Sequence, residues 1–181
     1  MQRHDPDHTR YAGADRRDHA AWVHGGLAPR FRPRGRFGPK TNVHTKEDAD
    51  HSLPYLLAVA LLDADVQTAQ LNPERIAKAD VQSLLHKVSV RQDASFTARY
   101  PNEFPSRTTV RLESGQSFTH EVSDYPGFPT RPFTWQEVSA KFDRLAAGRV
   151  GPDLRRDIKN AVRSLEDIQV SDLTKLLGEL N

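Results

Sequence analysis

The chain has 181 residues and no cysteine. This absence excludes disulfide scaffolds, thiolate metal sites and cysteine nucleophiles, and it favours a cytoplasmic location. Long hydrophobic runs are also lacking. The longest apolar stretch, residues 53–62, contains Pro54 and Tyr55 and is too short to span a bilayer. We therefore expect no association with a membrane.

Residues 1–40 show no sustained hydrophobic period and carry nine Lys and Arg residues against four Asp. This composition predicts a disordered basic tail. Within it, residues 30–37 combine four arginines with two phenylalanines, a pattern that can bind nucleic acid through phosphate neutralisation and base stacking. One short run of this kind is weak evidence, so a solvated tail is the preferred interpretation and nucleic acid is not an expected partner.

The first ordered element is predicted to be a helix. Thr45 and Asp48 have the spacing of a capping box, but a helix from Thr45 through residue 61 would place Pro54 in its interior, at a cost of about 3 kcal/mol or more. A start near Ser52 puts this proline in the first turn, where its missing N–H costs little. Short helices are also predicted over residues 73–76 and 80–86.

Strands are predicted where apolar and polar residues alternate. Alternation at residues 88–91 suggests one strand, and residues 108–112 and 118–122 suggest a β-hairpin with its turn at 114–116. A capping box formed by Thr134 and Glu137 then begins a helix whose predicted buried stripe is Val138, Phe142 and Leu145.

Two further amphipathic helices are predicted over residues 152–165 and 171–180. The element order predicts an α+β fold, a small antiparallel sheet covered by helices. We expect three parts: a disordered basic tail over 1–40, an α+β domain over 41–147, and C-terminal helices over 148–181.

Residues 49–55 hold the most informative group of polar side chains, with Asp50, His51, Ser52 and Tyr55 at a predicted helix start. His51 beside a helix N-terminus could meet a substrate carboxylate, because such ends favour anions. On the residues alone we prefer a structural interpretation, in which Asp50 or Ser52 caps the helix and Tyr55 packs in the core.

Two other arrangements are weaker. His44, Asp48 and His51 recur at intervals that would form a metal-binding face on a continuous helix, but the helix is predicted to begin after His44, so no metal is expected. A triad of Ser52, His51 and Asp50 is excluded, because three neighbours in sequence cannot adopt the relay geometry.

The stretch TKEDADHSLPY at residues 45–55 resembles the ADHSLPY signature of the MmgE/PrpD family, which includes 2-methylcitrate dehydratase and cis-aconitate decarboxylase. Further matches follow in the family's order over about 100 residues: Asp80–Val81 to Lys87–Val88, Tyr100–Pro101, Val110–Arg111–Leu112, Tyr125–Pro126–Gly127 and Lys141–Phe142. The sequence departs from the family pattern at Ala64, where glycine is usual, and at residues 127–132, which read Gly-Phe-Pro-Thr-Arg-Pro in place of Gly-His-Pro-x-Asn-Pro.

The resemblance implies the C-terminal α+β domain of a lyase that dehydrates or decarboxylates a di- or tricarboxylate without metal or organic cofactor, as in propionate metabolism. The family's general base lies in a helical domain that residues 1–40 do not resemble. By position, Tyr55 matches an active-site tyrosine, and Lys46 and His51 match substrate-binding positions. We therefore expect a helical partner domain, or a homo-oligomer, and an inactive isolated chain. The alternatives are a non-catalytic remnant and a binding module that uses the basic tail.

Overall fold

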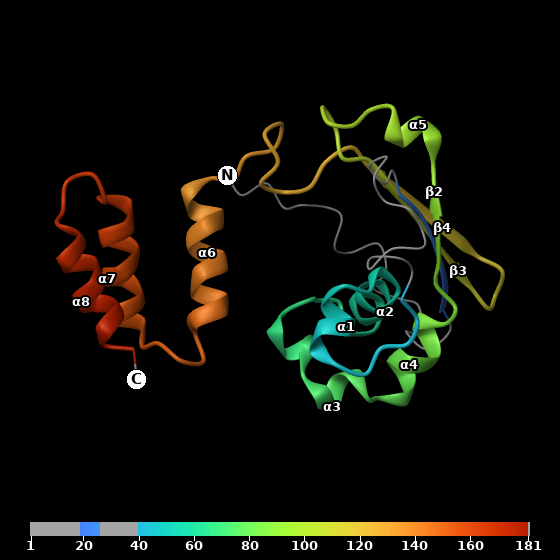
Figure 1. Cartoon of the computed structure of the whole chain (residues 1–181), viewed down its shortest axis with the longest axis horizontal. Helices are drawn as coiled ribbons and strands as arrows, with labels where there is room; N and C mark the ends of the chain where they lie inside the picture. The colour runs from blue at the N-terminus through green and yellow to red at the C-terminus, as the bar shows by residue number, and fades with distance from the viewer. Residues whose placement is uncertain (1–18, 26–39, 181) are drawn as a thin grey trace. The chain divides into compact units, whose positions relative to one another are not determined.

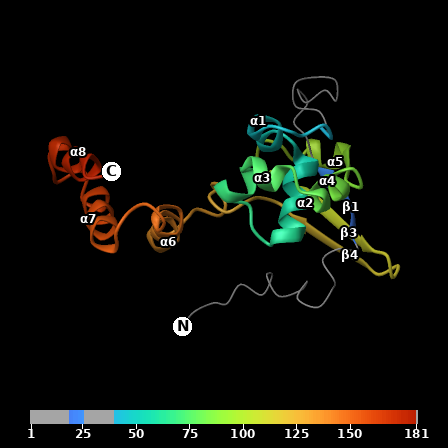
Figure 2. The ribbon, with the colours of Figure 1, turned by 90° about the horizontal axis from the view of Figure 1, so that it is seen from below.

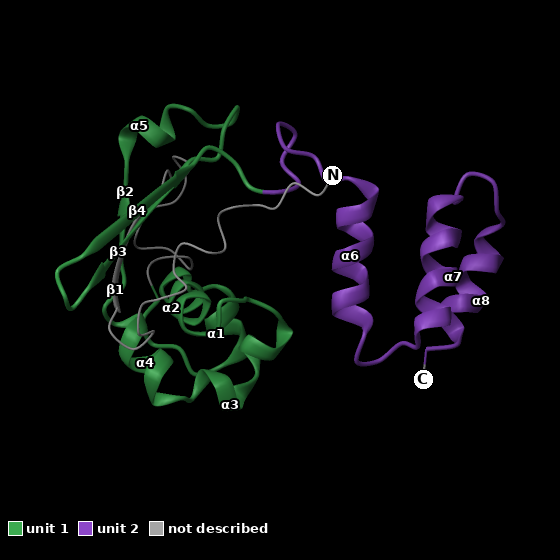
Figure 3. Ribbon diagram, turned by 180° about the vertical axis from the view of Figure 1, so that it is seen from behind, with its two compact units in different colours: residues 1–125 green, residues 126–181 purple. Residues whose placement is uncertain are grey.

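The computed structural model describes residues 19–25 and 40–180 (Figure 1). The chain divides into two compact units, with the boundary between Tyr125 and Pro126 (Figure 3). The predicted α+β domain extended to residue 147, so the observed boundary falls earlier in the chain. The first unit contains the sheet and the signature, and the second unit contains the C-terminal helices.

Six short helical segments form the helical part of the first unit. They are α1 (Lys46–Asp50), α2 (Leu53–Asp63), the 3-10 helix η2 (Thr68–Leu71), α3 (Pro73–Ile76), α4 (Ala79–Leu85) and α5 (Ala94–Thr97). Both proposed start signals are used: Thr45 caps α1, and Ser52 caps α2 with Pro54 in its first turn. Because two short helices replace one long helix, the proline interrupts no hydrogen bond.

The sheet has four strands in the order β2-β1-β3-β4. They are β1 (His19–Gly25), β2 (Ser89–Gln92), β3 (Ser106–Leu112) and β4 (Ser117–Val122). The hairpin β3–β4 and the pair β1–β3 are antiparallel, whereas β1 and β2 are parallel. The helices α1 to α4 lie on one side of the sheet (Figures 1 and 2). The predicted α+β class and hairpin are confirmed, with one parallel pair added.

Strand β1 corrects the prediction of a disordered tail over residues 1–40. Its backbone pairs with β3 along seven residues and with β2 along four, so it lies between them in the sheet. Residues 1–18 and 26–39, which include the arginine-rich segment 30–37, are outside the described residues. Local periodicity missed β1 because its pairing partners come much later in the chain.

The core of the first unit lies between α2, α4 and the sheet. Helix α2 is apolar on both faces: Tyr55 and Val59 pack in a cluster with α4, while Leu57 and Leu61 pack against Val88 before β2. From β3, Val110 is also buried. The signature helix is therefore the central element of this unit.

The second unit consists of α6 (Trp135–Ala146), α7 (Pro152–Arg163) and α8 (Val170–Gly178) (Figure 3). The predicted capping box of Thr134 and Glu137 is present at the start of α6. The prediction that Val138 and Leu145 are buried is wrong, since 44% and 50% of their surfaces are exposed. None of the helices in the described part of the chain is long and apolar enough to cross a membrane.

Candidate functional site

Helix α1 carries two of the three predicted site residues. Its capping box is complete: Thr45 Oγ1 accepts from the N–H of Asp48 at 3.1 Å and donates to the Asp48 carboxylate at 3.0 Å. These bonds lower the pKa of Asp48, the Thr45 hydroxyl being the largest cause. Ala49 is fully buried beneath the helix. The capping box and this buried contact fix a one-turn helix whose remaining side chains face solvent.

Lys46 and His51 lie at opposite ends of α1, and both side chains are exposed. His51 is the C-cap residue, and its ring nitrogen Nδ1 donates to the carbonyl of Glu47 at 3.0 Å. That bond orients the imidazole along the end of the helix. A lysine ammonium and an imidazole at an exposed surface are groups that can bind a carboxylate.

Ser52 closes the N-terminus of α2. Its hydroxyl accepts from the N–H of Tyr55 at 3.1 Å and donates to the carbonyl of Lys40 at 2.5 Å, and the residue is fully buried. The structure thus supports the capping role for Ser52. Because this helix end is covered by the chain itself, it offers no open anion site beside His51.

Tyr55 is fully buried, and its hydroxyl donates to the backbone carbonyl of Gln70 in η2. Burial raises the pKa of this tyrosine, an effect opposed by the nearby charge of Arg75. A phenol that is enclosed and bonded to the backbone has the features of a core residue. The structure therefore separates Tyr55 from the exposed pair Lys46 and His51.

An ion-pair network lies at the other end of α2. Arg75 donates from Nε and Nη2 to the two carboxylate oxygens of Asp63, at 2.9 and 2.8 Å, and from Nη1 to Asp80 at 2.8 Å. The Asp63 carboxylate also accepts from the side chain of Gln70 at 3.2 Å. These bonds raise the pKa of Arg75, so it stays charged. The network fixes η2, and with it the carbonyl that Tyr55 binds.

Ala64 ends α2 in the left-handed conformation, with φ of 57°. This is the position where the resemblance places glycine. The tight turn is thus kept despite the substitution, at the steric cost that a Cβ atom incurs in this region.

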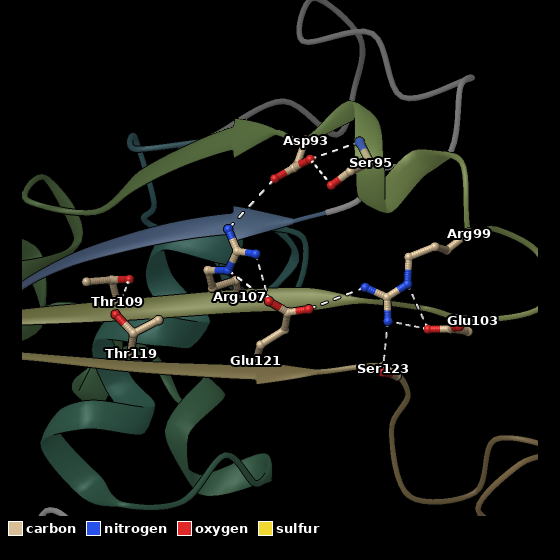
Figure 4. A network of polar contacts seen from close by, with 9 residues as sticks. All are labelled: Asp93, Ser95, Arg99, Glu103, Arg107, Thr109, Thr119, Glu121 and Ser123. Carbon is tan, nitrogen blue, oxygen red and sulfur yellow. Dashed lines mark hydrogen bonds and ion pairs between the residues drawn. The ribbon is translucent and has the colours of Figure 1, made fainter.

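A second polar network, which the sequence did not predict, lies at one end of the sheet (Figure 4). Glu121 accepts from Arg107 Nε and Nη2, at 2.9 and 2.7 Å, and from Arg99 Nη1 at 3.3 Å. The hydrogen bonds from Arg107, followed by those from Arg99, lower the pKa of Glu121.

Both arginines of this network also stack on the buried ring of Phe96, with guanidinium carbons 5.6 Å (Arg99) and 4.9 Å (Arg107) from its centroid. Arg99 further pairs with Glu103, and Arg107 approaches Asp93 at 4.0 Å. Since these positive charges are matched within the unit, the network joins α5 to β3 and β4 and has a structural role. Its members are up to 24 residues apart in sequence, so no local motif signals them.

The loop that begins the second unit contains the other departure from the family pattern. Gly127 has φ of 96°, and a Cβ added to it would lie 2.9 Å from the ring of Phe133. Its N–H donates to the carbonyl of Arg131 at 2.8 Å. Glycine is therefore required here, whereas the neighbouring histidine and asparagine positions of the family carry Phe128 and Arg131.

Across residues 19–25 and 40–180, no group of three or more His, Asp or Glu side chains is arranged to hold a metal ion. Of the three residues considered for such a face, Asp48 is used by the capping box and His51 by the end of α1. His44 precedes the helix, as expected from the sequence.

Comparison with known proteins agrees with the signature at residues 45–55. The model of the MmgE/PrpD C-terminal domain matches residues 34–167. Among curated proteins, cis-aconitate decarboxylase of Homo sapiens is 26% identical over 140 residues, which cover 74% of this chain and 28% of that protein. The chain thus spans little more than a quarter of the length of this relative. It belongs to the MmgE/PrpD C-terminal domain family.

Proposed function

We propose that this chain supplies the C-terminal domain of a cofactor-free lyase that dehydrates or decarboxylates a di- or tricarboxylate. The observation that carries the proposal is the family match over residues 34–167, which includes the complete signature. Because the matched stretch covers only 28% of the relative, most of such an enzyme must come from another polypeptide. We infer that this partner is a helical domain that carries the general base.

The proposed chemistry removes a proton beside a carboxylate and expels either a β-hydroxyl group or carbon dioxide. A base must accept that proton, and an acid must protonate the leaving oxygen or the carbanion. Exposed Lys46 and His51 are suited to hold substrate carboxylates, since a charge-assisted hydrogen bond to such a group contributes about 1.5–3 kcal/mol. Neither residue alone forms a complete acid and base pair, so turnover depends on the partner.

Tyr55 enters this scheme in one of two ways. As a catalytic residue it would donate to the leaving oxygen, which requires its hydroxyl to leave the carbonyl of Gln70 and reach solvent. As a core residue it would support α2 and leave the chemistry to the partner. The burial of Tyr55 and its bond to Gln70 favour the second role.

A non-catalytic remnant is the second candidate. The observation that favours it is the same buried tyrosine hydroxyl, because it leaves Lys46 and His51 as the only predicted site residues exposed in the described structure. The two candidates differ in whether a helical partner restores turnover.

The test is reconstitution. The full chain is mixed with a separately purified helical domain of an MmgE/PrpD protein from the same organism, and turnover is measured on 2-methylcitrate and on cis-aconitate. We expect activity only in the mixture. Lys46→Met and His51→Asn should each lower kcat/KM about tenfold or more, since each removes a charge-assisted contact.

The matched controls are Lys78→Met and His86→Asn, exposed residues outside α1. These should change kcat/KM less than threefold. Absence of turnover in a mixture that does form a complex would favour the remnant. Equal effects of the α1 variants and their controls would remove Lys46 and His51 from the site.

A further inference from the structure

We propose that the apolar faces of α6, α7 and α8 form the surface on which the helical partner domain docks. This inference rests on the proposed function, because it names the part of the chain that binds the proposed partner. It starts from an imbalance within the second unit between its apolar side chains and its buried core.

Large apolar side chains are exposed along all three helices of this unit. Exposed fractions run from 38% to 73% for eight residues, which we call the helical docking surface: Trp135, Val138, Leu145, Val162, Leu165, Val170, Leu177 and Leu180. On α6 the apolar residues follow a helical period, with Val138, Phe142 and Leu145 at intervals of four and three. Such a stripe marks a face that packs on another element.

The unit buries very little in return. Among its described residues, 126–180, the one buried large apolar side chain is Ile158 of α7, at 5% exposure. A helical unit of this size gains little hydrophobic stabilisation from one such residue. An apolar surface of this extent is characteristic of a binding site.

The contacts between α6 and α7 are polar and leave the apolar faces unused. Lys159 Nζ lies 2.6 Å from Asp143 Oδ2, and Arg155 Nη1 donates to the carbonyl of Asp143 at 2.9 Å. These contacts hold α6 beside the pair α7 and α8 (Figure 3). The helices are thus fixed to one another by charge, and the apolar stripe of α6 remains available.

The family comparison identifies the occupant. The match ends at residue 167, so α6 and α7 belong to the family's domain and are not an unrelated appendage. A family element with an uncovered apolar face should be covered by another element that family members share. Most of the relative's length lies outside the matched stretch and can provide it. Helix faces pack on helices by interlocking side chains, which suits a helical partner.

The chain has no cysteine, so a single introduced thiol reports the cover of one position. Val138→Cys on α6 and Leu177→Cys on α8 place the thiol on the docking surface. Ala140→Cys and Ser171→Cys are exposed positions on the opposite sides of the same helices and serve as matched controls. Labelling rates are measured for the full chain alone and with the separately purified helical domain used for reconstitution.

We expect the partner to slow labelling at positions 138 and 177 at least tenfold and at the controls less than twofold. Val138→Asp should weaken binding of the helical domain at least tenfold, and Ala140→Asp less than threefold. Binding and turnover with unchanged labelling would overturn this inference and leave the proposed function standing.

Two other outcomes would also overturn it. Slow labelling in the free chain that becomes faster on dilution would show that a second copy covers the surface. Slow labelling at every concentration would show that the chain covers itself. Failure of the helical domain to bind the unmodified chain would instead refute the proposed function, and this inference with it.

Discussion

The hydroxyl of Tyr55 donates to the carbonyl of Gln70, fifteen residues later in the chain, and so joins the signature helix α2 to η2. Both partners belong to the first unit, and the tyrosine ring is fully buried. The residue that the family signature assigns to the active site is therefore also a packing residue of this domain. Removing the hydroxyl separates the two roles.

Tyr55→Phe keeps the ring and removes the hydrogen bond. We expect a loss of about 1 kcal/mol in the free energy of unfolding, since the carbonyl of Gln70 loses its side-chain donor. The melting temperature should fall by about 4–8 °C for a domain of this size. Tyr100→Phe, at a 45% exposed tyrosine, should change it by less than 2 °C. Turnover per folded molecule, measured in the reconstituted mixture, should stay within about threefold. An unchanged melting temperature with a hundredfold loss of kcat would assign Tyr55 to the chemistry.

Ala64→Gly should stabilise the chain. Ala64 ends α2 with φ of 57°, a conformation in which Cβ crowds the following carbonyl at a cost of about 1–2 kcal/mol. Glycine removes that cost and adds entropy to the unfolded chain, so we expect a net gain of up to about 1 kcal/mol. The control is Ala77→Gly, at the end of α3 with φ of −75°, where glycine should destabilise by about 0.5–1 kcal/mol. Denaturant titration measures both, and the same sign for both would refute the steric account.

Local chemistry explains which helices the sequence predicted. The starts of α2 and α6 are set by Ser52 and by Thr134 with Glu137, residues within one turn of each boundary. The β3–β4 hairpin is similarly set by alternation and by Gly115 with φ of 86°. In each case the determining groups are neighbours in sequence, so a short window contains the signal.

Non-local packing explains what the sequence did not predict. Strand β1 pairs with β2 and β3, whose residues lie more than 60 positions away. Arg99, Arg107 and Glu121 meet only because the sheet brings their strands and loops together. The stripe on α6 was correctly predicted to be apolar, but periodicity shows only that a face is apolar and does not identify the partner that covers it.

Glu121 should make stability depend on pH. Its pKa is lowered in the folded chain, so its contribution is present above the unfolded value near 4.5 and is lost as pH falls through the folded value. The melting temperature of Glu121→Gln should be lower than that of the wild type above about pH 5, and the difference should disappear below about pH 4. The control Glu113→Gln removes a carboxylate that is 70% exposed and 4.0 Å from Lys87, and should have little effect. A Glu121→Gln difference that persists at low pH would show that charge is not its cause.

Deleting β1 provides the sharpest test of the fold. Composition alone predicts that residues 1–40 can be removed without loss, yet β1 lies between β2 and β3. A variant that lacks residues 1–25 would leave β2 without a neighbouring strand and expose the pairing edge of β3, and with them the backbone groups that β1 satisfies. We expect its melting temperature to fall by more than about 10 °C, or the variant to aggregate, since several kcal/mol of pairing and packing are lost. The control lacks residues 1–18 only, a polar stretch that ends just before β1, and should melt within about 2 °C of the full chain. Adding a synthetic peptide of residues 17–27 to the shorter variant should restore part of the lost stability. Equal melting of the two variants would mean that β1 contributes nothing to the sheet.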